Sequence, residues 1–161
     1  MTPAQITILR ADILAKQAIG QPLFNLDEQG ISNYYNAASL VNVWRTQVTR
    51  AEVYHQTSGE GTNWDWNTYK AQAVTEQNAW VQMFMGDIGN MALPNLRSGV
   101  EKIFGLNNAQ TLHVKAIGKR LANRVEAMFA VGSGSLVSPS VMAFEGTLAA
   151  QFIADVLAGI A

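Results

Sequence analysis

The side chains best suited to acid–base or metal chemistry are few and far apart in this sequence. The two histidines are His55 and His113, and neither belongs to an H-E-x-x-H pattern or has a second metal ligand at helical spacing. Glu60, Asp65 and Glu145 are scattered carboxylates in segments expected to be loops. Without cysteine, thiol catalysis, disulfides and cysteine-ligated metals are excluded. We therefore expect a protein that is not an enzyme and holds neither cofactor nor metal.

A glycine- and serine-rich segment is the one stretch with some likeness to a phosphate-binding loop. It reads Gly132-Ser133-Gly134-Ser135. A P-loop follows a strand and ends in Gly-Lys-Ser/Thr, and this segment does neither. We interpret it as a flexible joint between a helical body, residues 1–131, and a C-terminal arm, residues 132–161. The arm either belongs to the same domain or serves assembly, and its deletion is expected to leave a folded body.

Positive charge is concentrated in a segment predicted to form one long amphipathic helix, residues 107–130. Between Arg97 and Glu126 there are six basic and two acidic residues. The basic residues expected to face a DNA channel or another subunit are Lys115, Lys119, Arg120 and Arg124. Such a face is either simply solvated, or contacts DNA phosphates, or contacts an acidic surface on a neighbouring subunit.

The composition describes a chain that is poor in charge. Its 161 residues fit one domain. Charged residues make up 14% of the chain, against about 25% in an average soluble domain, and the net charge is −1. Either the surface is rich in neutral polar residues, or other subunits cover much of it, because interface cores are depleted in charge. No apolar run approaches the roughly 18 residues that cross a bilayer, so no membrane partner is expected.

Capping residues and helical periodicity predict a mainly α fold, a small helical bundle. A capping box at Thr2–Gln5 begins the first helix, in which Ile6, Leu9, Ile13 and Leu14 form one apolar stripe. A second helix is expected at about 28–36, after Asp27. A third is expected from about Ala38. One helical face would then carry Leu40, Val43, Trp44 and Val48. Further helix starts are predicted at Thr75, at Asn95 and at Asn107 or Asn108.

The C-terminal arm is predicted to contain a short strand or hairpin and an almost uncharged helix. The extended piece is Val141–Thr147, and the helix is Leu148–Ile160. This helix either folds back on the body or docks on a neighbouring subunit. The short strand that contains Phe144 could pair with an exposed strand edge. The residues expected at a subunit or portal interface are Phe144, Leu148, Phe152, Ile153, Val156, Leu157 and Ile160.

The four tryptophans are large apolar anchors as well as possible stacking surfaces. Trp44 and Trp80 lie on predicted apolar faces and are expected in the core. Trp64 and Trp66 lie beside a loop, where core and interface positions are equally expected.

Several short motifs that carry a family resemblance are spread over about residues 35–150. Four of them are Val43-Trp44-Arg45-Thr46, Val48-Thr49-Arg50-Ala51-Glu52, Asn63-Trp64-Asp65-Trp66 and Asn95-Leu96-Arg97-Ser98-Gly99-Val100. The most specific motif begins with Arg124–Ala130 and continues through Gly132–Gly134, Ser138-Pro139 and Phe144–Leu148. With these motifs the chain resembles a family of small virion proteins of tailed bacteriophages, interpreted as head–tail connector, or neck adaptor, proteins.

The resemblance implies a small helical protein that forms a ring, typically of twelve copies, below the portal. The ring would extend the DNA channel, hold passing genomic DNA only weakly and dock the next neck or tail protein. The chain would be made in the host cytoplasm and end in the neck of the virion. No catalytic residue is implied. Such a ring needs two different complementary patches on each copy.

Two other functions remain open at this point. The chain could be a DNA-binding module that uses the predicted basic helix, with binding that weakens steeply as salt increases. It could instead be a tail-completion or tail-terminator protein, and those more often have sheet-rich folds.

Overall fold

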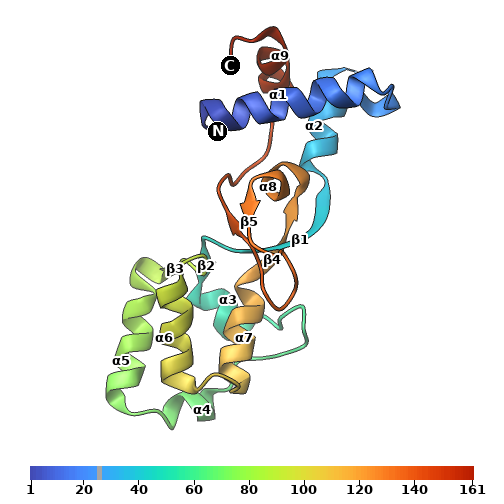
Figure 1. The fold of residues 1–161 in the computed structure, drawn as a ribbon. Coiled ribbons are helices and arrows are strands. Elements are labelled where there is room, and N and C mark those ends of the chain that lie inside the picture. Colours follow the sequence, from blue (N-terminus) through green and yellow to red (C-terminus); the bar gives the residue numbers. More distant parts are fainter. Residues whose placement is uncertain (25–26) are drawn as a thin grey trace. The chain divides into compact units, whose positions relative to one another are not determined.

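The computed structural model describes residues 1–24 and 27–161, which form two compact units (Figure 1). Unit 1 contains Met1–Val41 and Leu121–Ala161, and unit 2 contains Asn42–Arg120. Unit 2 is thus inserted between two segments of unit 1, and residues 132–161 belong to unit 1. In the described part of the chain, nine α-helices and three two-stranded sheets confirm the prediction of a mainly α fold.

Unit 1 is built from the two ends of the chain. Its N-terminal elements are α1 (Pro3–Ala18), the 3-10 turn η1 (Pro22–Phe24) and α2 (Glu28–Asn36). Its C-terminal elements are α8 (Arg124–Met128), β5 (Ala130–Val131), β6 (Val141–Met142) and α9 (Ala150–Ala158). The predicted capping box at Thr2 and the predicted cap at Asp27 are both confirmed. Helix α9 packs against α2 and α1, so both ends of the chain share one core (Figure 1).

The core of unit 1 takes apolar side chains from each of these helices. Its buried members are Leu9, Ile13, Phe24, Ile31, Tyr35, Val125, Phe129, Leu148, Ile153 and Val156. Each fully buried side chain of this size contributes about 1.5–3 kcal/mol to folding. Leu14, expected in the buried stripe of α1, is exposed instead.

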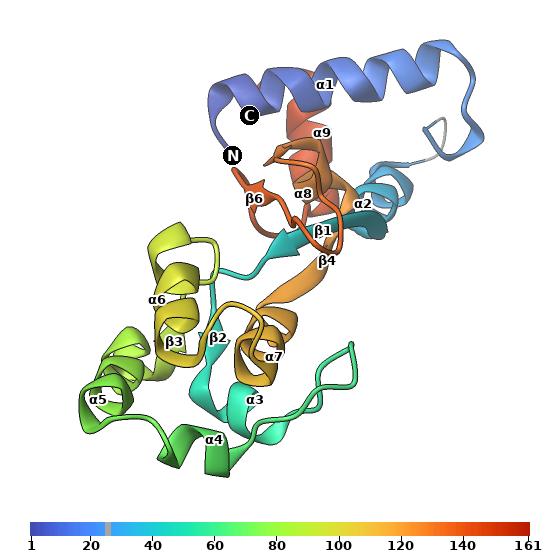
Figure 2. The same ribbon diagram turned by 60° about the horizontal axis from the view of Figure 1, so that its bottom comes forward.

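Unit 2 is a helical layer around an aromatic core. Its elements are β2 (Val48–Thr49), α3 (Arg50–His55), α4 (Trp66–Lys70), α5 (Val74–Met83), the 3-10 turn η2 (Met85–Asp87), β3 (Ile88–Gly89), α6 (Pro94–Phe104) and α7 (Ala109–Ile117). Helices α5, α6 and α7 lie side by side, and α3 packs on α7 (Figures 1 and 2). Strands β2 and β3 pair antiparallel, with Val48 opposite Gly89. A Cβ on Gly89 would lie 2.6 Å from the Phe84 ring, so only glycine fits there.

The helix predicted from Ala38 is wrong, because Ala38–Trp44 forms strand β1. It pairs with β4 (Lys119–Asn123). Ser39 Oγ donates to the carbonyl of Ala122 at 2.9 Å, and the Arg124 N–H donates to the carbonyl of Ala37 at 3.0 Å. Val41 and Val43 suit this extended backbone better than a helix, because their branched Cβ restricts χ1.

The single long helix predicted over residues 107–130 is also wrong. Its first part is α7, with Asn108 as the N-cap, as predicted. The helix ends at Gly118, where a Cβ would lie 2.7 Å from Met91. Strand β4 follows, and Asn123 then begins α8 with a capping box closed by Glu126. Long-range pairing with β1 therefore replaces the helix in the middle of the segment.

Four smaller differences concern the ends of elements. Helix α5 begins after Ala73 rather than at Thr75, and α6 begins at Pro94 after Leu93 rather than at Asn95. Within the extended piece predicted at 141–147, only Val141–Met142 is strand, antiparallel to β5. The terminal helix is shorter than predicted and ends at Gly159, whose φ of 75° favours glycine.

Candidate assembly surfaces

The C-terminal segment is fastened to unit 1 by hydrogen bonds on both sides of Leu148. Ser32 Oγ donates to the Leu148 carbonyl at 2.6 Å, and the Leu148 N–H donates to Asn36 Oδ1 at 2.8 Å. Two residues earlier, the Gly146 N–H donates to Glu126 Oε1 at 3.0 Å, while Asn123 Nδ2 donates to the Gly146 carbonyl at 2.8 Å. These polar groups hold the segment before α9 begins.

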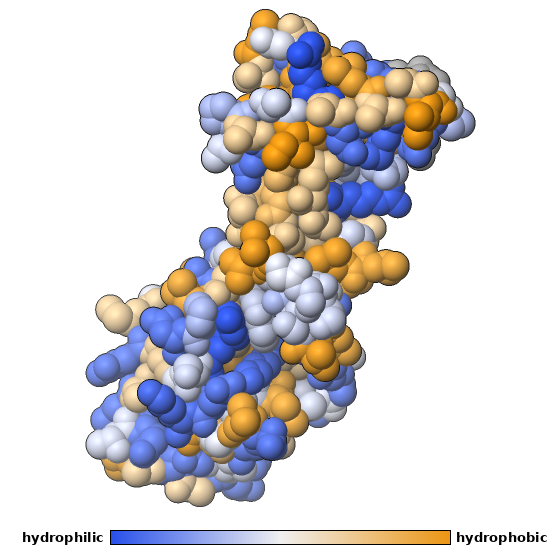
Figure 3. All heavy atoms as spheres, viewed as in Figure 1, coloured by the Kyte–Doolittle hydropathy of each residue, from blue (hydrophilic) through white to orange (hydrophobic). Residues whose placement is uncertain are grey.

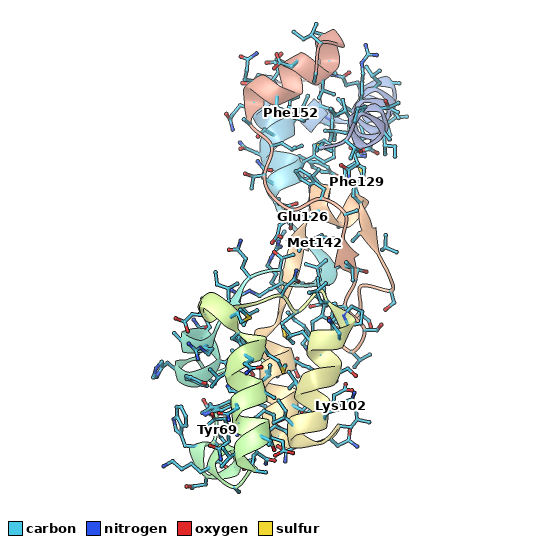
Figure 4. The ribbon with its side chains drawn as sticks, turned by 90° about the vertical axis from the view of Figure 1, so that its left-hand side faces the viewer. Tyr69, Lys102, Glu126, Phe129, Met142 and Phe152 are labelled. Atoms are coloured by element: carbon cyan, nitrogen blue, oxygen red, sulfur yellow. The ribbon has the colours of Figure 1, made fainter. Side chains whose placement is uncertain are left out.

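Glu126 is the centre of this fastening and is only 2% exposed. One carboxylate oxygen accepts the Gly146 N–H, and the other accepts the Asn123 N–H at 3.0 Å as part of the α8 capping box. One side chain thus both starts a helix and holds a segment that lies 20 residues further along the chain. Figure 4 shows Glu126 in unit 1, together with Phe129, Met142 and Phe152.

Most of the side chains predicted at a subunit or portal interface lie in the core of unit 1. Leu148, Ile153 and Val156 are buried. The partly buried ones that pack against this core are Phe144, Phe152 and Leu157. Ile160 alone among the seven predicted residues is largely exposed, at 77%. The apolar stripe of the terminal helix therefore mainly stabilises its own unit.

The glycine- and serine-rich segment predicted as a flexible joint is a hydrogen-bonded, largely exposed loop in which Gly134 is buried. Ser133 Oγ donates to the Ser138 carbonyl at 2.7 Å, and the Ser138 N–H donates to Ser135 Oγ at 3.0 Å. Gly134 is buried with a φ of 65°, and a Cβ there would lie 2.6 Å from Val41 Cγ1. At Gly134 the close approach of Val41 and the left-handed backbone both favour glycine.

The four basic residues predicted on one helical face are distributed over α7, β4 and α8. Lys115 Nζ lies 2.5 Å from Glu101 Oε1, and Lys119 pairs with Glu60. Arg120 is half-buried in β4. The Arg124 guanidinium lies 4.1 Å from the centre of the Tyr34 ring. The predicted basic helix is therefore interrupted by strand β4, and the two lysines are each paired with a carboxylate.

The two histidines of unit 2 have different surroundings. His113 is fully buried, with Nε2 at 2.7 Å from the Val53 carbonyl and Nδ1 at 3.1 Å from Thr62 Oγ1. It therefore joins α7 to α3 and to the following loop. His55 is exposed at the end of α3. Among residues 1–24 and 27–161, no three His, Cys, Asp or Glu side chains are grouped to hold a metal ion. None of the described helices has both the length and the apolar character to span a membrane.

The tryptophans follow the prediction for the core. Trp44 and Trp80 are buried. Trp64 is half-buried and stacks on Trp80 with ring centres 5.1 Å apart, so it completes the aromatic core of unit 2. Trp66 is the most exposed of the four and lies against Tyr54 at 4.8 Å.

Glu52 is a carboxylate of unit 2 whose two oxygens both accept hydrogen bonds. It accepts the Thr49 N–H at 2.7 Å in the capping box of α3, and Arg45 Nη2 lies 2.5 Å from its other oxygen. Partial burial acts to raise the pKa of Glu52. The hydrogen bonds from Thr49 and Arg45 favour the charged form more strongly, so the pKa of Glu52 lies below its ordinary value of 4.5.

We expect Glu52 to make the stability of unit 2 fall with acidification. Because its pKa is lower in the folded state, its stabilisation is present above about pH 4.5 and is lost as the pH falls through the folded-state pKa. Glu52→Gln should reduce the loss of stability between pH 5 and 3 and cost about 1 kcal/mol at pH 7. Urea unfolding of both proteins across this pH range measures the effect. Parallel pH profiles would contradict the assignment.

The structure also exposes an apolar surface that the predictions missed, the outer face of α1. It faces away from the core stripe of Leu9 and Ile13. Its large side chains are Ile8 and Leu14, which are 52% and 45% exposed, and the C-cap residue Ile19, which is 73% exposed, follows them. Its small exposed side chains are Ala4, Ala11, Ala15 and Ala18. In Figure 3, apolar residues follow the visible side of α1.

Unit 2 carries a second apolar surface, a groove between α5 and α6 of about 300 Å³. We call it the α5–α6 groove. Its lining residues are Thr75, Glu76, Ala79 and Met83 from α5 and Gly99, Lys102 and Ile103 from α6. A Cβ on Gly99 would lie 3.0 Å from the Met83 sulfur, so the two helices approach closely there.

Comparisons with known proteins identify no relative of this chain. No family model, no curated protein and no solved structure matches the chain.

Proposed function

We propose that this chain is a structural protein that assembles with copies of itself, as the head–tail adaptor ring of a tailed bacteriophage. The observation that carries the proposal is the outer face of α1, which is mainly apolar, with the exposed Thr7 among its alanines, and is open to solvent without a charged side chain on it. The motifs that resemble neck adaptor proteins give the assembly its place in the virion.

Leaving such a face in water costs free energy, because its apolar surface is not removed from solvent. Contiguous exposed apolar surface is uncommon in monomers and usually marks an interaction site. Charged residues are depleted in the cores of interfaces, and this chain is only 14% charged. A face without charge on a helix of this length therefore suits burial against another subunit better than solvation.

The role of the ring follows from its place. Copies below the portal would extend the DNA channel and present a platform for the next neck or tail protein. Genomic DNA must slide through such a channel, so tight binding would be a disadvantage. The pairing of Lys115 with Glu101 and of Lys119 with Glu60 agrees with this, because paired lysines bind phosphates less strongly.

Native mass spectrometry of the full chain mixed with the portal protein of the same genome tests this function. We expect one complex in which a fixed number of copies, twelve in the family that the chain resembles, is added to the portal. The portal alone, and the portal with an unrelated protein of similar mass, are the controls. A portal that keeps its own mass at every ratio would refute the adaptor function.

A further inference from the structure

We propose that the outer face of α1 in one copy docks in the α5–α6 groove of a second copy. This inference rests on the proposed function and names the two surfaces through which neighbouring copies meet. Both surfaces are exposed, both are mainly apolar, and they lie on different units of the chain.

The outer face of α1 has the residue spacing of a helix that packs on other helices. Its exposed residues Ala4, Ile8, Ala11, Ala15 and Ala18 are separated by four, three, four and three positions. This is the spacing of the a and d positions of a heptad, which align along one side of a helix. Alanine allows a close approach of the partner backbone, and Ile8, Leu14 and Ile19 project as larger knobs.

The α5–α6 groove is suited to receive such knobs. Met83 and Ile103 supply apolar walls, and Gly99 contributes no side chain. A groove of about 300 Å³ lies at the lower limit of the size of ligand pockets, so it takes a few apolar side chains rather than a whole helix. An amphipathic helix laid along a groove, with anchors at helical spacing, is a common recognition mode.

Charged side chains beside the two surfaces favour one direction of α1 along the α5–α6 groove. Arg10 lies on α1 at one side of the outer face, where its Nη2 donates to the Leu157 carbonyl at 3.3 Å and leaves other guanidinium N–H groups for a partner. Glu76 and Lys102 lie on opposite helices of the groove. None of the three forms an ion pair with any residue that the structure describes. Docking with Arg10 beside Glu76 pairs opposite charges, whereas the reverse direction would place Arg10 beside Lys102. Complementary charges at the rim of an interface fix its register in this way.

The pairing of two different surfaces has a consequence for symmetry. A contact between α1 and α1 would be isologous and would stop at a dimer. A contact between α1 and a groove leaves one free surface of each kind on every pair, so copies continue to add until a ring closes. Heterologous docking is therefore the geometry that a ring requires.

Site-directed cross-linking tests the contact, because the chain contains no cysteine. Ala15→Cys places one thiol on the outer face of α1, and Ala79→Cys places one in the groove. With a short bismaleimide, we expect a covalent heterodimer when the two variants are mixed and little homodimer from either variant alone. One variant carries a tag, so that the three dimers differ in mass. As a matched control, Ala71→Cys is exposed in the same unit, outside the groove, and should not cross-link to Ala15→Cys.

Charge reversal supplies a second test that does not need a thiol. Arg10→Glu and Glu76→Arg should each weaken assembly about two- to fivefold, as expected for an exposed ion pair. The chain that carries both substitutions should regain much of the lost assembly. In that chain every contact again pairs opposite charges, with the acid on α1 and the base in the groove. Circular dichroism checks that each variant keeps its helices. Two losses that simply add, with no recovery, would contradict the pairing.

The outcomes separate this inference from the proposed function. Assembly with the expected heterodimer supports both. Assembly with homodimers of Ala15→Cys, or with no cross-link at all, overturns the groove as the docking site and leaves the adaptor function standing. A chain that stays monomeric up to millimolar concentration and adds nothing to the portal overturns both.

Discussion

Deletion of residues 132–161 will unfold unit 1 instead of leaving a stable helical body. The deletion removes Leu148, Ile153 and Val156 from a core shared with α1 and α2. At about 1.5–3 kcal/mol for each buried side chain, with the half-buried Phe144, Phe152 and Leu157 in addition, the loss is comparable to the 5–15 kcal/mol that stabilises a typical domain.

Hydrogen exchange followed by mass spectrometry measures this result segment by segment. Peptides from α1 and α2 should lose their protection in the truncated chain. The matched control is deletion of residues 159–161 alone, which removes the exposed Ile160 and no buried side chain, and which should leave the protection unchanged. A truncated chain that still protects α1 and α2 would contradict the role given to α9.

Glu126→Ala will destabilise unit 1 by about 2–4 kcal/mol. The substitution removes the acceptor for both the Asn123 and the Gly146 N–H groups. A buried donor without an acceptor costs about 1–3 kcal/mol, and the α8 capping box is lost as well. Chemical denaturation measures the change, and faster exchange of the Gly146 amide locates it.

Two controls separate this effect from the general loss of a carboxylate. Glu126→Gln keeps one side-chain oxygen as an acceptor and should cost less than the alanine variant. Glu28→Ala changes an exposed carboxylate in the same unit and should stay within about 0.5 kcal/mol of the original chain. Equal effects of Glu126→Ala and Glu28→Ala would refute the fastening role of Glu126.

Local signals predicted the parts of the fold that depend on neighbouring residues. The capping boxes and caps at Thr2, Asp27 and Asn108 act within a few residues, and all three begin helices in the structure. A fourth signal of the same kind was overlooked, because Asn123 and Glu126 have the spacing of a capping box and divide the predicted long helix.

Contacts far apart in sequence account for the errors. Residues 38–44 have apolar side chains at positions that fit a helical face, but they form a strand because residues 119–123 pair with them. Nothing within either segment specifies that partner. Tertiary pairing therefore overrides a local pattern that is ambiguous between helix and strand over a short apolar run.

The candidate surfaces could be predicted only in part, for a related reason. Hydrophobicity correctly identified the apolar stripe of the terminal helix but could not decide whether its own unit or another subunit covers it, and α1 and α2 cover most of it. The outer face of α1 was missed because four of its members are alanines, which are compatible with core, surface and interface. Their heptad spacing was the signal that could have revealed it.

Cryo-electron microscopy of the portal mixed with the full chain tests the central claim most directly. The account predicts a ring of copies below the portal, with the outer face of α1 covered by the next copy and the DNA channel extended along the axis. A portal that carries no added density, under conditions in which it is itself intact, would contradict the account.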